Sequence, residues 1–372
     1  MTGLFFDTAE VFFVPLLVIS FLIVYTIIPA IIRVSREKHL FDEPDGRSSH
    51  VQKTPSLGGV AIFASIVITY LLAIPKVSFL SNIHALIPSL VILFFIGLKD
   101  DILVIDPYKK LLAQVIASGL FIYFADIRIG NLFGLFTAYE IPYGPSFVVT
   151  LFVMIVIINA YNLIDGIDGL AAGLGIIIAL SFGVYFYLVK LYWASELSLV
   201  LIGSLLAFMR FNFSRRKKIF MGDNGSLVVG FILAVLAIKF IQFNEFSHAL
   251  HVPNAPTITV LILAVPLFDT LRVFTQRIAS GCSPFTPDRN HIHHFIIDNG
   301  FSHFKATCLL SFSTLLLVII GFYFFYDASV SYSFVGLIVI FSLYTLVFRR
   351  QVLVKQPYLR QRMLRKKARN AA

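Results

Sequence analysis

The chain has 372 residues, of which 58% are hydrophobic, 13% are charged and 39 are phenylalanine. A soluble globular domain has about one half apolar and one quarter charged residues, so this composition excludes a soluble domain, a disordered chain and a collagen-like repeat. Two cysteines, Cys282 and Cys308, are too few for a disulfide scaffold or a zinc knuckle. The apolar runs are long and continuous rather than alternating, which disfavours a β-barrel. The composition therefore predicts an all-α polytopic integral membrane protein.

Eleven stretches of the chain are apolar and long enough to cross a bilayer, which takes about 17–25 residues of helix. The predicted spans are residues 11–32, 57–75, 84–98, 111–125, 145–161, 169–189, 197–213, 226–243, 257–275, 306–326 and 333–348. The polar segment 126–144 indicates a small β-hairpin between the fourth and fifth spans. We expect one transmembrane catalytic domain over residues 1–348 and a basic cytoplasmic tail over 349–372.

The charge distribution predicts the orientation of these spans. The chain has 30 Lys and Arg against 20 Asp and Glu, a net charge of +10. With the N-terminus outside, 26 of the 30 basic residues fall on the inside, as the positive-inside rule requires. The positive excess is thus explained by topology and by attraction to anionic lipid headgroups, without nucleic acid.

Two adjacent carboxylates, Asp100 and Asp101, end the third predicted span on the inside. Such a pair is costly at a membrane helix end unless a positive group or a cation compensates for the repulsion. Lys110 follows after a short loop and offers a counter-charge or a phosphate contact. A solvated pair at a helix end is the alternative interpretation of the two aspartates.

A second inside segment contains four polar residues spaced by three: Asn159, Asn162, Asp165 and Asp168. This spacing places them on one helical or tight-turn face, and the glycines between them allow a ligand to approach the backbone. A capped helix break would explain one or two of these residues but not all four, so the pattern favours function.

Two further inside segments contain polar motifs. The motif Gly222-Asp223-Asn-Gly-Ser226 is an ordinary N-cap, with Asp223 or Ser226 starting the next helix, or else Asp223 is a ligand of Mg²⁺, which prefers one or two carboxylates plus substrate phosphates. The motif Asp288-Arg289-Asn-His291-Ile-His293-His294 has no second Cys or His cluster to complete a zinc site. Its side chains suit phosphate and sugar hydroxyls better.

Together, these motifs resemble the polyprenyl-phosphate N-acetylhexosamine-1-phosphate transferases, the glycosyltransferase 4 family, which includes the MraY type and the WecA/TagO type. The resemblance runs from about Arg47 to Ser302 and begins with Gly46-Arg-Ser-Ser-His50 and Thr54-Pro-Ser-Leu-Gly58-Gly59. It implies ten or eleven helices around an active site that faces the cytoplasm of a bacterial inner membrane. It also implies transfer of an amino-sugar 1-phosphate from a UDP-sugar to undecaprenyl phosphate, with release of UMP and a requirement for Mg²⁺, or Mn²⁺ in its place.

The resemblance implies a role for each polar residue by its motif position. Asn162 and Asp223 would hold the metal against the pyrophosphate. Asp100 or Asp101 would take the proton from the lipid phosphate or orient it. The other expected catalytic residues are Lys110, Asp165, Asp168, His291, His293 and His294. The expected substrate-binding residues are Arg47, His50, Asn159, Asp168, Asn212, Asp288 and Arg289.

The Arg-containing loop that ends in His-Ile-His-His resembles the WecA/TagO branch, which favours UDP-N-acetylglucosamine as donor and a first membrane step of cell-envelope polysaccharide synthesis. A muramoyl-pentapeptide donor is the alternative.

A secondary transporter would instead place ionisable residues at mid-membrane depth, whereas here they lie at the inside ends of the spans. One departure from the family pattern is the basic, proline-free segment 212–219, which weakens the assignment of Asn212 to the uridine. The sequence leaves the oligomeric state open, with a homodimer as one option.

Overall fold

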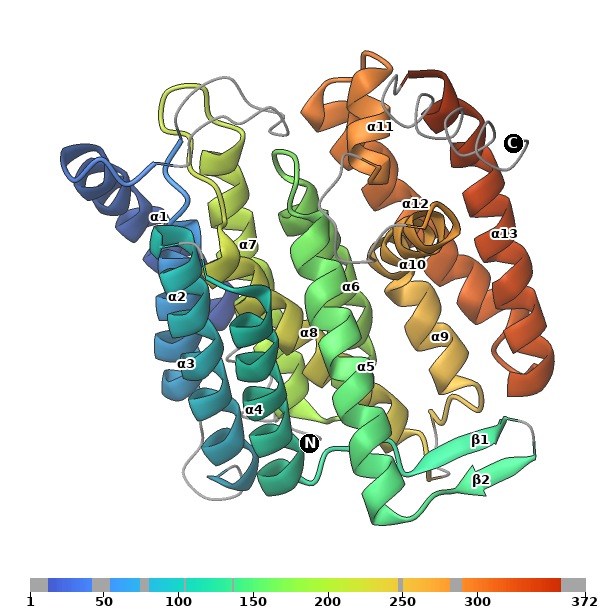
Figure 1. Cartoon of the computed structure of the whole chain (residues 1–372). Helices are drawn as coiled ribbons and strands as arrows, with labels where there is room; N and C mark the ends of the chain where they lie inside the picture. The colour runs from blue at the N-terminus through green and yellow to red at the C-terminus, as the bar shows by residue number, and fades with distance from the viewer. Residues whose placement is uncertain are drawn as a thin grey trace, which may run out of the picture.

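The computed structural model describes residues 13–41, 54–73, 80–103, 105–135, 137–246, 250–281 and 290–355. These residues form thirteen α-helices and one two-stranded sheet (Figure 1). The helices are α1 (Phe13–Glu37), α2 (Gly58–Ala73), α3 (Leu80–Leu103), α4 (Pro107–Ala125), α5 (Tyr143–Ile164), α6 (Leu170–Leu188), α7 (Tyr192–Asn212), α8 (Asp223–Phe243), α9 (Ala255–Ile262), α10 (Ala264–Ala279), α11 (Ile292–Asp298), α12 (His303–Phe324) and α13 (Val330–Lys355).

The structure confirms the prediction of a polytopic helical membrane protein. Within the described residues, α1, α5, α6, α7, α8 and α12 are each long and apolar enough to cross a bilayer, and the α9–α10 pair would make a seventh span. Each of the eleven predicted spans coincides with a helix or, for residues 257–275, with this pair. The third helix continues beyond its predicted end at residue 98, so Asp100 and Asp101 belong to the last turn of α3.

The predicted span over residues 257–275 is broken rather than continuous. Helix α9 ends at Ile262, α10 begins at Ala264, and the two axes differ by 79°. Pro266 explains the break, because it has no backbone N–H and its ring would clash with the carbonyl group four residues earlier, that of Ile262. At the third position of a new helix the same proline is tolerated, since the first N–H groups of a helix have no intrahelical partner.

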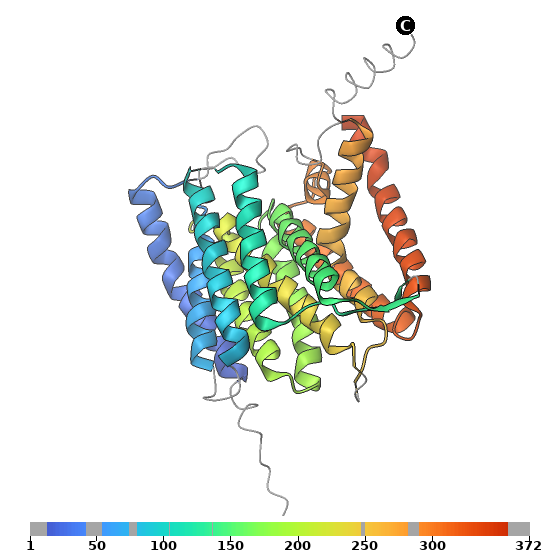
Figure 2. The same cartoon turned by 60° about the horizontal axis from the view of Figure 1, so that its bottom comes forward.

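Helix α8 lies at the centre of the bundle and packs against α2, α3, α5 and α6. Every residue from Asn224 to Ile238 is buried. A helix that is apolar on all sides is stable in a protein interior or within a bilayer, and the burial of α8 shows that it occupies the interior. In Figure 2, α1–α4 form one flank of the molecule and α12–α13 the other, with α5–α8 between them. Asp223 is the first residue of α8, so it lies at one end of the bundle's central helix.

The predicted hairpin is confirmed at the opposite end of the bundle from α11 (Figure 1). Strand β1 (Asn131–Leu135) pairs antiparallel with β2 (Ala138–Glu140). The Glu245 carboxylate, just after α8, accepts hydrogen bonds from the backbone N–H groups of Gly130 (2.6 Å) and Asn131 (3.2 Å). The hairpin is therefore attached to the C-terminal end of α8, and the C-terminal ends of α3, α5, α7 and α10 lie on the side that bears the polar motifs.

Replacement of Gly97 should separate α3 from α8. A Cβ atom at this position would come within 2.6 Å of the backbone N and Cα atoms of Asn224, and backbone cannot yield as a side chain can. We expect Gly97→Ala to destabilise the protein by about 1–3 kcal/mol, as overpacking of a core does, and to lower its unfolding temperature in detergent. Gly144→Ala is the matched control, because nothing lies within 4 Å of its added Cβ. Equal unfolding temperatures for the two variants would contradict the close approach of α3 and α8.

Candidate active site

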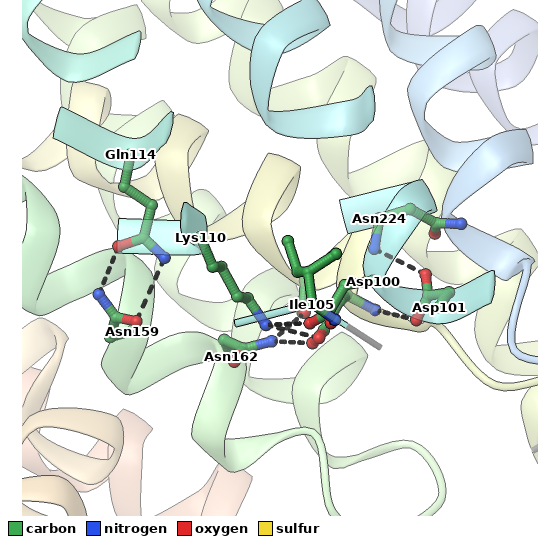
Figure 3. A network of polar contacts seen from close by, with 10 residues as sticks. Asp100, Asp101, Ile105, Lys110, Gln114, Asn159, Asn162 and Asn224 are labelled. Carbon is green, nitrogen blue, oxygen red and sulfur yellow. Dashed lines mark hydrogen bonds and ion pairs between the residues drawn. The ribbon is translucent and has the colours of Figure 1, made fainter. Parts of the chain in front are cut away.

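Three charged side chains from three helices meet at the N-terminus of α8, and Figure 3 labels two of them, Asp100 and Lys110. The ammonium of Lys110, in the first turn of α4, lies 3.2 Å from Oδ2 of Asp100 and 2.5 Å from Oδ2 of Asp223. The other oxygen of Asp100 accepts a hydrogen bond from the backbone N–H of Ile105 at 2.7 Å. The expected counter-charge for the aspartate pair is therefore present, and the alternative of a merely solvated pair is wrong for Asp100.

Asn162 joins this cluster from the last turn of α5. Its Nδ2 donates to Oδ1 of Asp223 at 2.5 Å and to Oγ of Ser226 at 2.7 Å. Both oxygens of Asp223 are thus bound, one by an amide and one by an ammonium. The structure brings together four residues that the sequence motifs predicted: Asp100, Lys110, Asn162 and Asp223.

Asp101 faces the backbone at the start of α8. Its two oxygens accept hydrogen bonds from the backbone N–H groups of Asp223 (2.8 Å) and Asn224 (2.9 Å). The first N–H groups of a helix lack intrahelical partners and carry partial positive charge, so a carboxylate there is stabilised. Helix α8 does begin at Asp223, as one interpretation of the motif predicted, but the carboxylate that binds the first N–H groups of the helix is that of Asp101 in α3.

Asn159 lies one turn before Asn162 and pairs with Gln114, which lies one turn after Lys110. Nδ2 of Asn159 donates to Oε1 of Gln114 at 2.6 Å, and Nε2 of Gln114 donates back to Oδ1 of Asn159 at 3.2 Å (Figure 3). Gln114 is 1% exposed. The reciprocal amide pair fixes the register of α4 against α5, which places Lys110 and Asn162 at the same point.

The predicted shared face of four polar residues does not extend to Asp168, because α5 ends at Ile164 and the chain turns before Asp168. The Asp168 carboxylate instead lies 2.7 Å from Nζ of Lys218 and 2.9 Å from Nδ1 of His303. Burial raises the pKa of Asp168, but the hydrogen bonds of His303 and Lys218 outweigh this effect and hold the pKa below its ordinary value. Asp168 is therefore an ionised member of a second cluster.

Asn212 connects the turn after Asp168 to the segment that precedes α8. Its Oδ1 accepts from the backbone N–H of Gly169 at 2.5 Å and its Nδ2 donates to the carbonyl oxygen of Ile219 at 2.8 Å. The residue is 4% exposed. These contacts place Asn212 inside the protein and add to the doubt that the basic segment 212–219 raised about a uridine contact.

The described part of the histidine motif begins at Asn290 and lies against α10. Nδ1 of His291 lies 2.8 Å from Oδ2 of Asp269, and the backbone N–H of Ile292 donates to Oδ1 of Asp269 at 2.9 Å. The rings of His293 and His294 lie 4.3 Å apart. Four predicted site residues, Arg47, His50, Asp288 and Arg289, lie outside the described residues.

Sequence reasoning missed Asp269, Arg272, Gln114, Lys218 and His303. A signal existed for the first two, because an Asp and an Arg inside a predicted membrane span mark a functional site by default. Lys218 was counted only for orientation. No local pattern distinguished Gln114 or His303 from other polar residues near a helix end.

The residues at the start of α8 suit a hard cation. Mg²⁺ takes oxygen ligands and in enzymes is held by one or two carboxylates together with substrate phosphates. Asp223 and Asp100 supply carboxylate oxygens at one point of the site, and Asn162, whose Nδ2 binds Asp223 there, carries an amide oxygen as well. Among the described residues no group of three or more Asp, Glu, His or Cys forms a complete metal cage, so such a cation would need ligands from a substrate.

The amide pair can be tested by removing one or both partners. Gln114→Leu leaves one face of the Asn159 amide unpaired, at a cost of about 1–3 kcal/mol, and should lower both stability and any catalytic rate. Gln114→Leu/Asn159→Leu removes both amides, so we expect it to recover most of the lost stability and rate. The test compares the unfolding temperature and the turnover rate of the single and double variants with those of the wild type. Recovery of stability without recovery of rate would instead support the predicted direct contact of Asn159 with substrate.

The Asp165 carboxyl, which ends α5, should make stability depend on pH. Burial, followed by the nearby carboxylates of Asp223 and Asp168, raises the pKa of Asp165 from 3.8 to about 7. The folded protein therefore binds this proton more tightly than the unfolded chain, and the stability it contributes is lost as the pH rises through about 7. Asp165→Asn should unfold at a higher temperature than the wild type at pH 8, with a gap that narrows towards pH 5. A difference in unfolding temperature that stays the same from pH 5 to pH 8, measured with a metal chelator in the buffer, would contradict this effect of the Asp165 charge.

Comparison with known proteins agrees with the motifs. Residues 83–241 match the family model described as glycosyl transferase family 4. The undecaprenyl-phosphate alpha-N-acetylglucosaminyl 1-phosphate transferase of Yersinia pestis is 31% identical over 291 residues, which cover 76% of each chain. The enzyme of the same name from Escherichia coli strain K12 is 30% identical over 78% of this chain and 77% of its own. The decaprenyl-phosphate N-acetylglucosaminephosphotransferase of Mycolicibacterium smegmatis is 31% identical over 72% of this chain and 71% of its own.

This similarity covers more than two thirds of the chain and includes the α3, α4, α5 and α8 residues of the polar cluster within residues 83–241. The chain therefore belongs to glycosyl transferase family 4, as the resemblance of its motifs predicted.

Proposed function

We propose that this protein transfers N-acetylglucosamine 1-phosphate from UDP-N-acetylglucosamine to undecaprenyl phosphate and releases UMP. An oxygen of the lipid phosphate would attack the phosphorus next to the sugar. The bond from that phosphorus to the bridging oxygen would break, and UMP would leave with the bridging oxygen. The product would be a lipid-linked sugar diphosphate, the start of a cell-envelope polysaccharide.

One observation supports this proposal above the others: an Asp100–Lys110–Asp223–Asn162 cluster lies at the end of a membrane bundle in a chain whose relatives are named for this reaction. Phosphoryl transfer needs positioning and charge neutralisation more than covalent catalysis. The cluster offers one fixed cation and oxygen ligands for another. No observation favours the muramoyl-pentapeptide alternative.

The proposal includes Mg²⁺ held by Asp223, Asp100 and Asn162, where it would neutralise negative charge on the donor diphosphate. Lys110 would bind a phosphate oxygen, since its ammonium already lies within 3.2 Å of two carboxylates at this point. Asp100, held by the backbone N–H of Ile105, would orient the lipid phosphate or accept its remaining proton. The second pKa of a phosphate monoester is about 6, so at neutral pH orientation is the larger task.

Asp101 would act indirectly in this scheme. Both of its oxygens are bound by backbone N–H groups of α8, so it would hold Asp223 in place rather than contact the lipid phosphate. On the second cluster, Asp168 keeps Lys218 and His303 next to the loop that follows α5. The Lys218 ammonium would face the donor, whose diphosphate is negative.

We also propose that the site faces the cytoplasm of a bacterial inner membrane. The distribution of basic residues supports this orientation, because 26 of 30 would then lie inside. Arg36 at the end of α1 donates to the carbonyl oxygen of Arg216, so basic residues of two segments meet at the site end of the bundle. UDP-sugars are cytoplasmic metabolites, whereas the isoprenoid acceptor is confined to the bilayer, and a site at this membrane surface can reach both.

The reaction can be tested with purified protein in detergent or in vesicles. Undecaprenyl phosphate and labelled UDP-N-acetylglucosamine should yield UMP and a lipid-linked product in equal amounts when Mg²⁺ is supplied, and neither product with a chelator. Parallel reactions with UDP-N-acetylgalactosamine and UDP-N-acetylmuramoyl-pentapeptide compare donors. A rate with the pentapeptide donor above that with UDP-N-acetylglucosamine would reject the proposed donor.

Asp223→Asn should abolish turnover, by at least about 100-fold, while the protein stays folded in the membrane. An amide cannot supply the negative charge that Lys110 and a hard cation both require at this position. Asp126→Asn is the matched control, because Asp126 forms an exposed ion pair with Arg128 at the opposite end of the bundle. Near-normal activity of Asp223→Asn at saturating Mg²⁺ would contradict its assignment as a ligand.

A further inference from the structure

Asp269 and Arg272 form a buried ion pair in α10 to which the proposed reaction assigns no role. Nη2 of Arg272 lies 2.7 Å from Oδ1 of Asp269, and the two residues are 0% and 1% exposed. A spacing of three places both side chains on the same face of the helix. Charges buried in this way lose hydration energy, and in a membrane helix they mark a functional position by default.

Three consecutive residues are hydrogen-bonded to this ion pair: Asn290, His291 and Ile292. Asp269 accepts from the backbone N–H of Ile292 through Oδ1 (2.9 Å) and contacts Nδ1 of His291 through Oδ2 (2.8 Å). Nη2 of Arg272 also donates to the carbonyl oxygen of Asn290, at 2.5 Å. The ion pair therefore binds the segment just before α11 by backbone and side chain together.

The contact with Asp269 determines which nitrogen of His291 holds a proton. A carboxylate only accepts hydrogen bonds, so Nδ1 of His291 must donate to it. In a neutral His291 the other nitrogen, Nε2, then keeps its lone pair. Carboxylates orient histidines in the same way in metal sites and in hydrolase triads.

The segment fixed by Asp269 is the one that brings α11 to the active site. His293, in the first turn of α11, packs its ring on Gly166, where an added Cβ would lie 2.1 Å from Nε2. Gly166 lies in the loop between Asp165 and Asp168. The rings of His291 and His293 are stacked at 5.7 Å with 11° between their planes, so a shift of His291 would disturb His293. Burial lowers the pKa of His293 well below its ordinary value, and its ring is therefore neutral at pH 7.

We propose that Asp269 is a positioning residue: with Arg272 it fixes the tautomer of His291 and holds α11 against the loop that contains Asp165 and Asp168. Its effect would reach the reaction through the histidine segment, whose side chains suit the sugar hydroxyls and phosphates of the proposed donor. The transfer rates used to test this inference rest on the proposed function, whereas the contacts of Asp269 do not depend on it.

The test compares Asp269→Asn, Asp269→Glu, His291→Gln and the Asp269→Asn/His291→Gln double variant in the transfer assay. Asp269→Asn keeps the shape of the side chain but can present an N–H to Nδ1 of His291 and favour the wrong tautomer. We expect its kcat/KM for the UDP-sugar to fall about 10- to 150-fold, as for the loss of one charge-assisted contact. The KM for undecaprenyl phosphate should change less than about twofold, because the acceptor is not bound through this segment.

Non-additivity separates positioning through His291 from a general structural role. The kcat/KM of the double variant for the UDP-sugar should be at most about twofold below that of His291→Gln alone. Once His291 is replaced, Asp269 has no imidazole left to orient, so its replacement costs little more. Asp269→Glu keeps the carboxylate and should retain more activity than Asp269→Asn. The matched control is Glu196→Gln in α7, another buried carboxyl, 7% exposed, which should leave the transfer rate unchanged.

Unfolding temperatures in detergent provide the folding control, and rates are compared per folded protein well below each midpoint. Full activity of Asp269→Asn, additive losses in the double variant, or an Asp269→Glu variant as inactive as Asp269→Asn would each overturn the inference. A wild-type protein without transferase activity would instead reject the proposed function. Solid-state ¹⁵N spectra of histidine-labelled wild type and His291→Gln would then still test the tautomer, since Nδ1 of His291 should be protonated.

Discussion

Repulsion among three carboxylates at the start of α8 is the constraint on which the site depends. Asp100, Asp101 and Asp223 lie close together, and each is stabilised by a group from another element. Asp101 binds two backbone N–H groups of α8, Lys110 binds both of the other carboxylates, and Asn162 binds Asp223. Because these groups come from α3, α4, α5 and α8, the four helices must keep their relative positions for the negative charge to be tolerated.

The same arrangement recurs elsewhere at the end of the bundle that bears the polar clusters. Asp168 is held by Lys218 and His303, and Asp269 by Arg272 and His291. In each case a carboxylate on one segment is bound by cationic or imidazole groups, at least one of which comes from a different segment. Removing the partner of a buried charge is strongly destabilising, so the contacts of Asp168 with Lys218 and His303, and of Asp269 with His291, each tie two segments together. The loops of the site are thus ordered by ion pairs, whereas the bundle beneath them is held by apolar packing around α8.

The division between loops held by ion pairs and a bundle held by apolar packing suits the proposed phosphosugar transfer. A lipid phosphate and a nucleotide diphosphate bring several negative charges to one place, and fixed cations that are already oriented need no rearrangement when those charges develop. Lys110 is such a cation at the first cluster and Lys218 at the second. The apolar bundle keeps the carboxylates at the membrane surface, where a water-soluble donor and a lipid acceptor can meet.

The sequence by itself determined the membrane class, the approximate positions of most helices, the hairpin and the family, because hydropathy and motif order are local properties. It also placed Lys110 beside Asp100, since only a short loop separates them. The tertiary structure alone decided which partner each polar side chain takes. A spacing of three predicts a shared face only while the helix lasts, and α5 ends at Ile164, so Asp168 turns to Lys218 rather than to Asp223. Likewise, the sequence shows that Asp269 lies in an apolar stretch, but it does not show the contact of Asp269 with His291. That contact depends on how α10, after the 79° bend, packs against residues more than twenty positions away. Such long-range packing leaves no local pattern in the chain.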